Sequence, residues 1–207
     1  MTAQERVICY IDGFNLYFGL KESHFERYLW LDVGALAQSL LRPDQVLVAA
    51  KYFTARISGP PDKQTRQATY LAALHEHTRC PIIEGRYQDV RVECRKCHGV
   101  WVQHQEKATD VNIAVEMLTD AMADAFDAAL LVSGDADLIP AIAAVRKPPQ
   151  SKRVVCAFPP NRTSAEIARV NPVCFTIGRK KLATSQMPVS VTVAATGAVL
   201  SRPPSWK

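Results

Sequence analysis

The residues 7–15, Val-Ile-Cys-Tyr-Ile-Asp-Gly-Phe-Asn, are the most informative part of this chain about its fold. The first five of these residues form a short continuous apolar run, which is typical of a parallel strand buried on both faces. The run stops at Asp12-Gly13, where a turn is expected. A strand that ends in a charged turn indicates an α/β fold whose functional residues follow its strands.

Outward from this stretch, strand and helix patterns alternate from residue 6 to residue 178. Apolar runs predict further strands at 45–53, 81–83, 128–132, 153–158 and 173–177. Helical spacing of apolar residues predicts helices at 33–41, 61–77, 110–122, 138–145 and 163–170. The predicted caps at the starts of two of these helices are Asp32 and Thr109. Right-handed crossovers then place helices on both faces of a mostly parallel sheet.

We expect one domain over residues 5–178. Residues 84–105 are polar, aromatic and irregular, and they indicate an insertion in the form of an extended hairpin. No helical pattern follows Gly178, and residues 179–207 are rich in Ser, Thr, Pro and Val. We therefore expect a basic, flexible C-terminal tail there, or a strand that forms only with a partner.

Composition bounds the functional class. The chain has 207 residues, of which 48% are hydrophobic and 22% charged, as is usual for a globular protein. No stretch approaches the ~20 apolar residues of a membrane helix, and the first residues do not form a secretory signal. We therefore expect a cytoplasmic protein without a membrane partner. The net charge of +5 is compatible with a polyanionic partner, and the oligomeric state stays open.

Aspartates follow two of the predicted strands. Asp12 ends the first apolar run, and Asp135 and Asp137 come directly after the run at 128–132. Asp110 lies at the start of the long helix. If the two strands are neighbours, these carboxylates converge at one edge of the sheet, where a hard divalent cation would relieve their repulsion. Each aspartate alone is better explained as a turn residue or helix cap, and it is the four together that indicate a site.

Three segments resemble one known family. They are Tyr-Ile-Asp-Gly-Phe-Asn (10–15), Lys-Ala-Thr-Asp-Val-Asn-Ile-Ala-Val-Glu-Met-Leu (107–118) and Leu-Val-Ser-Gly-Asp-Ala-Asp-Leu (131–138). In this order they resemble the NYN domain, a relative of the PIN-domain ribonucleases. The resemblance covers about residues 5–178. It implies a PIN-like three-layer α/β/α sandwich and a nuclease site that depends on Mg²⁺ or Mn²⁺.

The resemblance also assigns roles by position. The residues that would hold the metal and serve in catalysis are Asp12, Asp110, Asp135 and Asp137. Asn15 would lie beside the first ligand, and Ser133 would contact phosphate. The implied activity is phosphodiester hydrolysis, as an RNA endonuclease, in which a hydroxide activated on the Asp-bound metal is the nucleophile.

Two alternatives remain beside the nuclease. The small branch of the family with a Cys-x-x-Cys insert also resembles an NADH-dependent monooxygenase that hydroxylates the hydroxypyridine 6-hydroxy-3-succinoylpyridine in nicotine degradation. The residues give this little support, because no Gly-x-Gly-x-x-Gly fingerprint follows the first strand and no flavin motif is evident. The other alternative is a module that binds nucleic acid without catalysis.

The insertion contains Cys94-Arg-Lys-Cys97-His98, followed by His104. A Cys-x-x-Cys pair forms one half of many zinc sites. The two histidines could complete a structural zinc site, and Cys80 could replace one of them. An ordinary exposed loop and a redox thiol pair are the alternatives.

Basic and aromatic residues near the predicted strand ends are candidates for RNA contact. The basic ones, which could neutralise phosphates, are Arg56, Lys107, Arg146, Lys152 and Arg162. The aromatic ones, which could stack on unpaired bases, are Tyr17, Phe18 and Trp101. For each, a plain surface or packing role competes. Arg162 is the leading substrate-binding candidate, because it follows a strand directly and a helix begins just after it.

Overall fold

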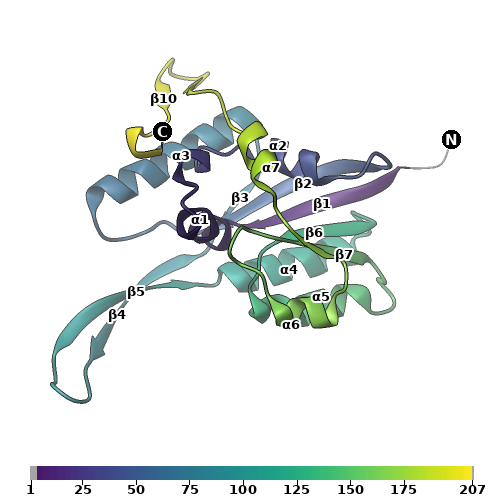
Figure 1. Ribbon diagram of the computed structural model, residues 1–207, viewed down its shortest axis with the longest axis horizontal. Helices are drawn as coiled ribbons and strands as arrows, with labels where there is room; N and C mark the ends of the chain where they lie inside the picture. The colour runs from purple at the N-terminus through teal and green to yellow at the C-terminus, as the bar shows by residue number, and fades with distance from the viewer. Residues whose placement is uncertain (1–3, 207) are drawn as a thin grey trace.

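A six-stranded parallel sheet forms the centre of the molecule (Figure 1). The computed structural model describes residues 4–206, except for the side chains of residues 87–90 and 102–106. The sheet order is β3-β2-β1-β6-β7-β8, and every neighbouring pair is parallel. The strands are β1 (Glu5–Asp12), β2 (Gln45–Thr54), β3 (Ile82–Glu84), β6 (Ala128–Val132), β7 (Arg153–Phe158) and β8 (Cys174–Thr176). The predicted α/β fold is confirmed.

The two central strands are buried on both faces. All five residues of β6 are buried, as are the last six of β1. Side chains of β1 alternate between two hydrophobic cores: Cys9 and Ile11 pack into one, and Ile8 and Tyr10 into the other. The continuous apolar runs seen in the sequence therefore reflect coverage by helices on both sides.

Helices cover each face of the sheet. One face carries α1 (Gly13–Glu22), α2 (Val33–Leu40) and α3 (Pro61–Thr78), and the other carries α4 (Thr109–Met122), α5 (Ile139–Arg146) and α6 (Ala165–Val170). Short 3-10 turns η1 (Glu26–Tyr28) and η2 (Ala136–Leu138) follow α1 and β6. The result is a PIN-like three-layer α/β/α sandwich. Across residues 4–206, no helix is both long and apolar enough to cross a membrane.

The predicted helix caps have different outcomes. Asp32 caps α2 as expected, since its Oδ1 accepts a hydrogen bond from Ala35 N at 2.8 Å. Thr109 does not cap α4: the cap position belongs to Ala108, whose φ of 74° is left-handed. Thr109 is instead buried as the first helical residue, and within the described part of the chain its Oγ1 has no hydrogen-bond partner. Asp110 follows in the first turn, where the helix dipole favours a carboxylate.

The connections reverse direction between β1 and β6. From β1 the chain moves to β2 and β3 on one side, and from β6 it moves to β7 and β8 on the other. In open parallel sheets such a switch point leaves a crevice beyond the carboxyl ends of the strands, where ligands bind. Asp12 ends β1 and Ser133 follows β6, so the predicted acidic residues lie at this place.

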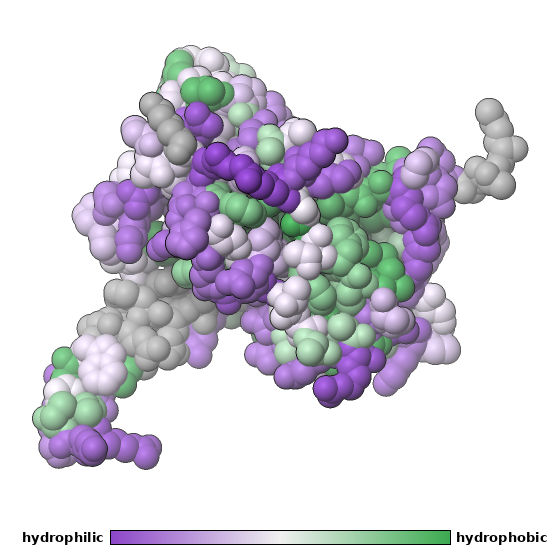
Figure 2. Space-filling model, viewed as in Figure 1, coloured by the Kyte–Doolittle hydropathy of each residue, from purple (hydrophilic) through white to green (hydrophobic). Residues whose placement is uncertain are grey.

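Residues 84–105, expected as an extended hairpin, contain most of an antiparallel pair that projects from the sandwich (Figure 1). Its strands are β4 (Arg86–Glu93) and β5 (Val100–Lys107). Hydrophobic and hydrophilic residues mix at its outer end (Figure 2), where Val100 and Trp101 are about half exposed, at 48% and 50%.

The chain beyond Gly178 corrects an expectation. No helix was predicted there, yet α7 (Arg179–Thr184) forms, followed by a small hairpin of β9 (Ser190–Thr192) and β10 (Val199–Ser201) and by η3 (Pro204–Trp206). Leu182, Met187, Val191 and Trp206 are buried in the first core. Trp30 Nε1 also donates to the Pro188 carbonyl at 2.6 Å. These buried residues are too widely spaced along the chain to form a periodic pattern. The prediction of a flexible tail therefore depended on composition alone.

Candidate active site

Asp12, the last residue of β1, is the most buried member of an acidic cluster at the carboxyl edge of the sheet. Its side chain is only 4% exposed. Oδ1 accepts a hydrogen bond from Asn15 N at 2.9 Å, which makes Asp12 the N-cap of α1. Oδ2 accepts a hydrogen bond from Ser133 Oγ at 2.9 Å. These two bonds hold the carboxylate between β1 and the loop that follows β6.

The loop after β6 is tied to Asp12 by a chain of hydrogen bonds. Ser133 Oγ accepts from Asp135 N at 3.0 Å, and Asp135 Oδ1 accepts from Asp137 N at 3.0 Å. Asn15 Oδ1 accepts from Gly134 N at 2.9 Å, which joins the two loops directly. Ser133 is completely buried and its hydroxyl is used inside this network. In this arrangement Ser133 positions Asp12, and its expected contact with a phosphate stays a prediction.

Electrostatics show that the four aspartates share one neighbourhood. Burial raises the pKa of Asp12 to about 6, and the charges of Asp110 and Asp135 add to the rise, while the bonds from Asn15 and Ser133 oppose it. Asp110 is half-buried in the first turn of α4. Burial raises its pKa as well, together with the charges of Asp135 and Asp137. The carboxylates thus repel one another across the switch point, as like charges at one site do.

The four carboxylates are chemically suited to bind a hard divalent cation. Carboxylate oxygens are the ligands that Mg²⁺ and Mn²⁺ prefer, and a cation would remove the repulsion among these groups. The side chains stand in an open arrangement: nowhere in the described part of the chain do three Asp, Glu, His or Cys side chains converge tightly enough to hold an ion as they stand. The residues that would hold it are Asp12, Asp110, Asp135 and Asp137.

Two glycines let the loops of the site approach closely. A Cβ on Gly134 would lie 1.8 Å from the Arg162 carbonyl oxygen, and one on Gly13 would lie 2.6 Å from the Phe53 carbonyl oxygen and from the Tyr52 ring. Neither position can take a side chain without moving backbone. The sequence indicated tight turns at both glycines, and the structure shows close packing of neighbouring chain segments as the reason.

Arg162 borders the site but is engaged within the protein. Its guanidinium forms an ion pair with Glu22 of α1 and lies 6.0 Å from the centre of the Phe18 ring. Its backbone carbonyl packs over Gly134. In this arrangement Arg162 joins the β7–α6 loop to α1, and its contact with substrate stays a prediction.

The other basic candidates divide between the two edges of the sheet. Arg56 follows the carboxyl end of β2 and pairs with Glu84 at 2.8 Å. Lys107 is exposed at the end of β5, just before α4. Lys152 and Arg146 lie near the start of β7, at the amino edge, and are bound to other parts of the protein. Of these four residues, Arg56 and Lys107 are therefore the ones on the side of the acidic cluster.

The cysteine motif lies at the end of the projecting hairpin. Hydrogen bonds from the backbone N–H groups of Cys97 and Lys96 lower the pKa of the Cys94 thiol. His98 Nδ1 lies 2.7 Å from Glu93 Oε1. The side chain of His104 is outside the described residues.

Cys80 is not available to the motif, because it is buried in the core with its thiol donating to the Ala50 carbonyl. The tip of the hairpin therefore supplies Cys94, Cys97 and His98 to the expected zinc site, and these described side chains do not form a metal group as they stand. Zinc binding here stays a prediction.

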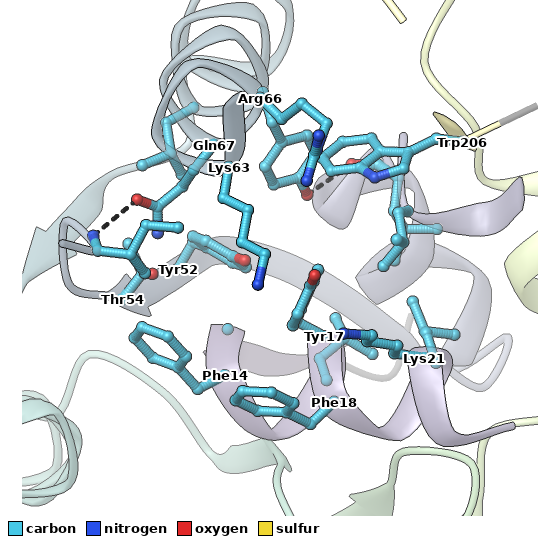
Figure 3. Close-up of a pocket in the computed structure, with 18 of the residues that line it drawn as sticks. Phe14, Tyr17, Phe18, Lys21, Tyr52, Thr54, Lys63, Arg66, Gln67 and Trp206 are labelled. Carbon is cyan, nitrogen blue, oxygen red and sulfur yellow. Dashed lines mark hydrogen bonds between the residues drawn. The ribbon is translucent and has the colours of Figure 1, made fainter. Parts of the chain in front are cut away.

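Sequence reasoning missed a pocket of about 280 Å³ between α1 and α3 (Figure 3). Tyr17 and Phe18, considered as stacking residues, both line it, whereas Trp101 is far away in the hairpin. Aromatic residues at positions 14, 17 and 18 share one face of a helix, and this spacing was the available signal. The contributions from α3 and from the C-terminus depend on long-range packing.

Comparisons with known proteins show a family and a similar fold. The sequence matches the NYN domain family over residues 6–177. It is 29% identical over 178 residues to 6-hydroxy-3-succinoylpyridine 3-monooxygenase HspA of Pseudomonas putida, a match that covers 68% of this chain and 55% of that protein. The chain thus spans about half the length of this relative. A protein of unknown function from Vibrio parahaemolyticus has a similar fold, with a TM-score of 0.56, 20% identity, and coverage of 86% of this chain and 96% of that one.

Proposed function

The chain belongs to the NYN domain family, and from this premise we propose that it is a metal-dependent ribonuclease whose working groups are Asp12, Asp110, Asp135 and Asp137. One observation carries the proposal: Asp12, which is only 4% exposed at the switch point of the sheet, has the carboxylates of Asp110 and Asp135 in its neighbourhood. Such a cluster destabilises a protein, and a site for a cation explains why it is present.

Each aspartate makes a distinct contribution. Asp12 is held by Asn15 N and Ser133 Oγ, so its position is fixed before any ligand arrives. Asp110 approaches from α4 on the other face of the sheet. Asp135 and Asp137 lie on the loop after β6 and are more accessible. A divalent ion bound here would neutralise phosphoryl oxygens and lower the pKa of water beside the phosphorus atom.

RNA is the substrate that the surroundings favour. The net charge of the chain is +5, and the exposed Lys107 and the partly paired Arg56 lie at the carboxyl edge beside the cluster. Positive side chains at this edge would attract the phosphate backbone and offset the negative charge of the aspartates. An extended single strand could then bring one phosphodiester to the four carboxylates.

A second candidate is NADH-dependent hydroxylation of a hydroxypyridine. The name of the Pseudomonas putida relative and the aromatic pocket beside α1 favour it. Against it, β1 leads into Asp12-Gly13-Phe14-Asn15 instead of the glycine-rich turn that usually binds a dinucleotide. We therefore rank it second.

A paired assay on one preparation tests the proposal. Wild type, Asp135→Asn and Asp44→Asn are each incubated with labelled single-stranded RNA and Mg²⁺ or Mn²⁺, and in parallel with NADH and a hydroxypyridine. Asp44 is the matched control, because it is an exposed acid at the opposite edge of the sheet. We expect RNA cleavage that falls at least about a hundredfold in Asp135→Asn, persists in Asp44→Asn and stops on chelation.

Two outcomes would overturn the proposal. Intact RNA together with NADH oxidation that depends on the hydroxypyridine would establish the hydroxylase. RNA binding that survives chelation and the Asp135→Asn change, without cleavage, would leave a binding module.

A further inference from the structure

The pocket between α1 and α3 is a built site next to the acidic cluster (Figure 3). Gly13, which follows Asp12 directly, lines it, and so does Thr54, the last residue of β2. Because Asp12 pairs with Phe53 in the sheet, the pocket opens beside the same carboxyl edge. Its volume of about 280 Å³ is at the lower end for small-molecule pockets, and it suits a ligand with one ring system.

Aromatic side chains form the floor and walls. Phe14 and Phe18, one turn apart on α1, have ring centres 6.2 Å apart and nearly parallel planes. The Tyr17 ring lies edge-on to the Phe18 ring, with ring centres 5.3 Å apart. Tyr52 stands opposite them on β2, and it can approach α1 closely because residue 13 is a glycine. Rings held in this way offer flat surfaces on which a planar ligand stacks.

A positive charge enters the same space. The Lys63 ammonium points from α3 into the pocket, toward Tyr52 and Tyr17 (Figure 3). Arg66 nearby is paired with Asp62 at 2.7 Å, whereas among the described side chains Lys63 takes part in no ion pair. Lys21 adds a third cation, and the described residues that line the pocket include no carboxylate. The pocket therefore selects for negative charge.

The far end of the pocket is closed by the C-terminal segment. Trp206 lines it and packs edge-on against Tyr70, with ring centres 5.9 Å apart. The Tyr70 hydroxyl is occupied, since it donates to the Leu31 carbonyl at 2.9 Å. Trp206 and Tyr70 meet the Arg66 guanidinium at this end (Figure 3), and that guanidinium is paired with Asp62. The Lys63 ammonium therefore marks the part of the pocket where an anionic group would lie.

We propose that this pocket binds a planar aromatic ring that carries an anionic group, with the ring against the aromatic walls and the anion on Lys63. Two kinds of molecule have this chemistry: a nucleotide of an RNA strand, and a free aromatic carboxylic acid. In both cases the ligand would be placed beside Asp12. The inference goes beyond the proposed cleavage and does not require it.

The test is calorimetric titration in EDTA with probes that differ in one feature. UMP and uridine form one pair, nicotinate and nicotinamide the other, and inorganic phosphate supplies charge without a ring. We expect at least one anionic ring to bind about tenfold more tightly than its uncharged counterpart and than phosphate. Binding of UMP would identify the ligand as a nucleotide, and binding of nicotinate would identify it as a free aromatic carboxylic acid.

Variants place the binding in the pocket. We expect Lys63→Gln and Phe18→Ala each to weaken the favoured probe about tenfold or more. Phe18 is 42% exposed, so its removal should leave the fold intact. Lys180→Gln, which removes an exposed cation on α7, should change nothing.

The proposal fails if neither anionic ring binds at about 1 mM, if phosphate binds equally well, or if Lys63→Gln has no effect in a protein that still melts like wild type. Comparing the titration with RNA cleavage by the wild type separates the two proposals. Probe binding by a wild-type protein that leaves RNA intact supports the pocket and overturns the nuclease, whereas RNA cleavage by a wild-type protein that binds no probe does the opposite.

Discussion

At the residue scale, the site depends on where single side chains are buried. The sequence was sufficient to select Asp12 and Asp135, because each directly follows an apolar run or its short turn. It could not show that Ser133 is fully buried and serves Asp12, since that depends on how two loops distant in sequence pack together. The sequence indicated a tight turn at Gly134, but it could not show that the Arg162 carbonyl packs against this glycine.

Replacing Asp12 tests the cost of its buried charge. Its pKa is about 6 in the folded protein, against 3.8 without the fold. The folded state therefore holds the proton more firmly, and the free energy of unfolding falls as the pH rises from about 4 to about 6. In EDTA at about pH 7.5, Asp12→Asn should be more stable than wild type by about 1–3 kcal/mol. Urea unfolding of wild type and Asp12→Asn, at about pH 7.5 and at about pH 3, measures the difference in stability.

At about pH 3 the gain should disappear, because Asp12 is then largely protonated in both the folded and the unfolded state. A variant that is less stable than wild type by the same amount at both pH values would contradict the assigned environment of Asp12.

Replacing Gly134 tests the contact between two site loops. A Cβ at this position would lie 1.8 Å from the Arg162 carbonyl oxygen, so backbone must move. We expect Gly134→Ala to lower the free energy of unfolding by about 1–3 kcal/mol. Gly178→Ala is the matched control, because nothing lies within 4 Å of its added Cβ, and it should stay within about 0.5 kcal/mol of wild type. Equal effects of the two substitutions would contradict the loop packing.

At the element scale, the sequence predicted strands and helices where many consecutive residues share one pattern. β1 and β6 are recognisable because both faces are buried, and α3 because its periodic face spans several turns. The C-terminal elements are three to six residues long. In such short segments the packing partner decides the conformation, and local propensity says little.

Removing Trp206 tests the attachment of the C-terminal segment. This side chain is 7% exposed and packs against Trp30 and Tyr70. We expect Trp206→Ala to cost about 3 kcal/mol, the lower end for a buried tryptophan, because the segment lies at the edge of the core. Thermal unfolding followed by circular dichroism measures the loss. Trp101→Ala, in the exposed part of the hairpin, should leave the melting temperature unchanged; similar shifts in both variants would mean that the segment is not anchored as described.

At the scale of the whole molecule, strand order determines where the site lies. The sequence predicted a parallel sheet, but it could state the convergence of Asp12 with Asp135 only on the condition that their strands are neighbours. Pairing between β1 and β6 meets that condition. Such an order arises from contacts between segments more than a hundred residues apart, which no local pattern encodes. The aromatic pocket has the same origin, because α1, α3 and Trp206 meet only in the folded chain.

The central claim, that four aspartates at the switch point hold a divalent ion, is tested most directly by titrating metal-free protein with Mn²⁺ and following the signal of the free ion by electron paramagnetic resonance. We expect wild type and Asp44→Asn to bind Mn²⁺ alike, and Asp135→Asn to bind it at least about tenfold more weakly. Equal binding by wild type and Asp135→Asn, or no binding by wild type at about 1 mM, would contradict it.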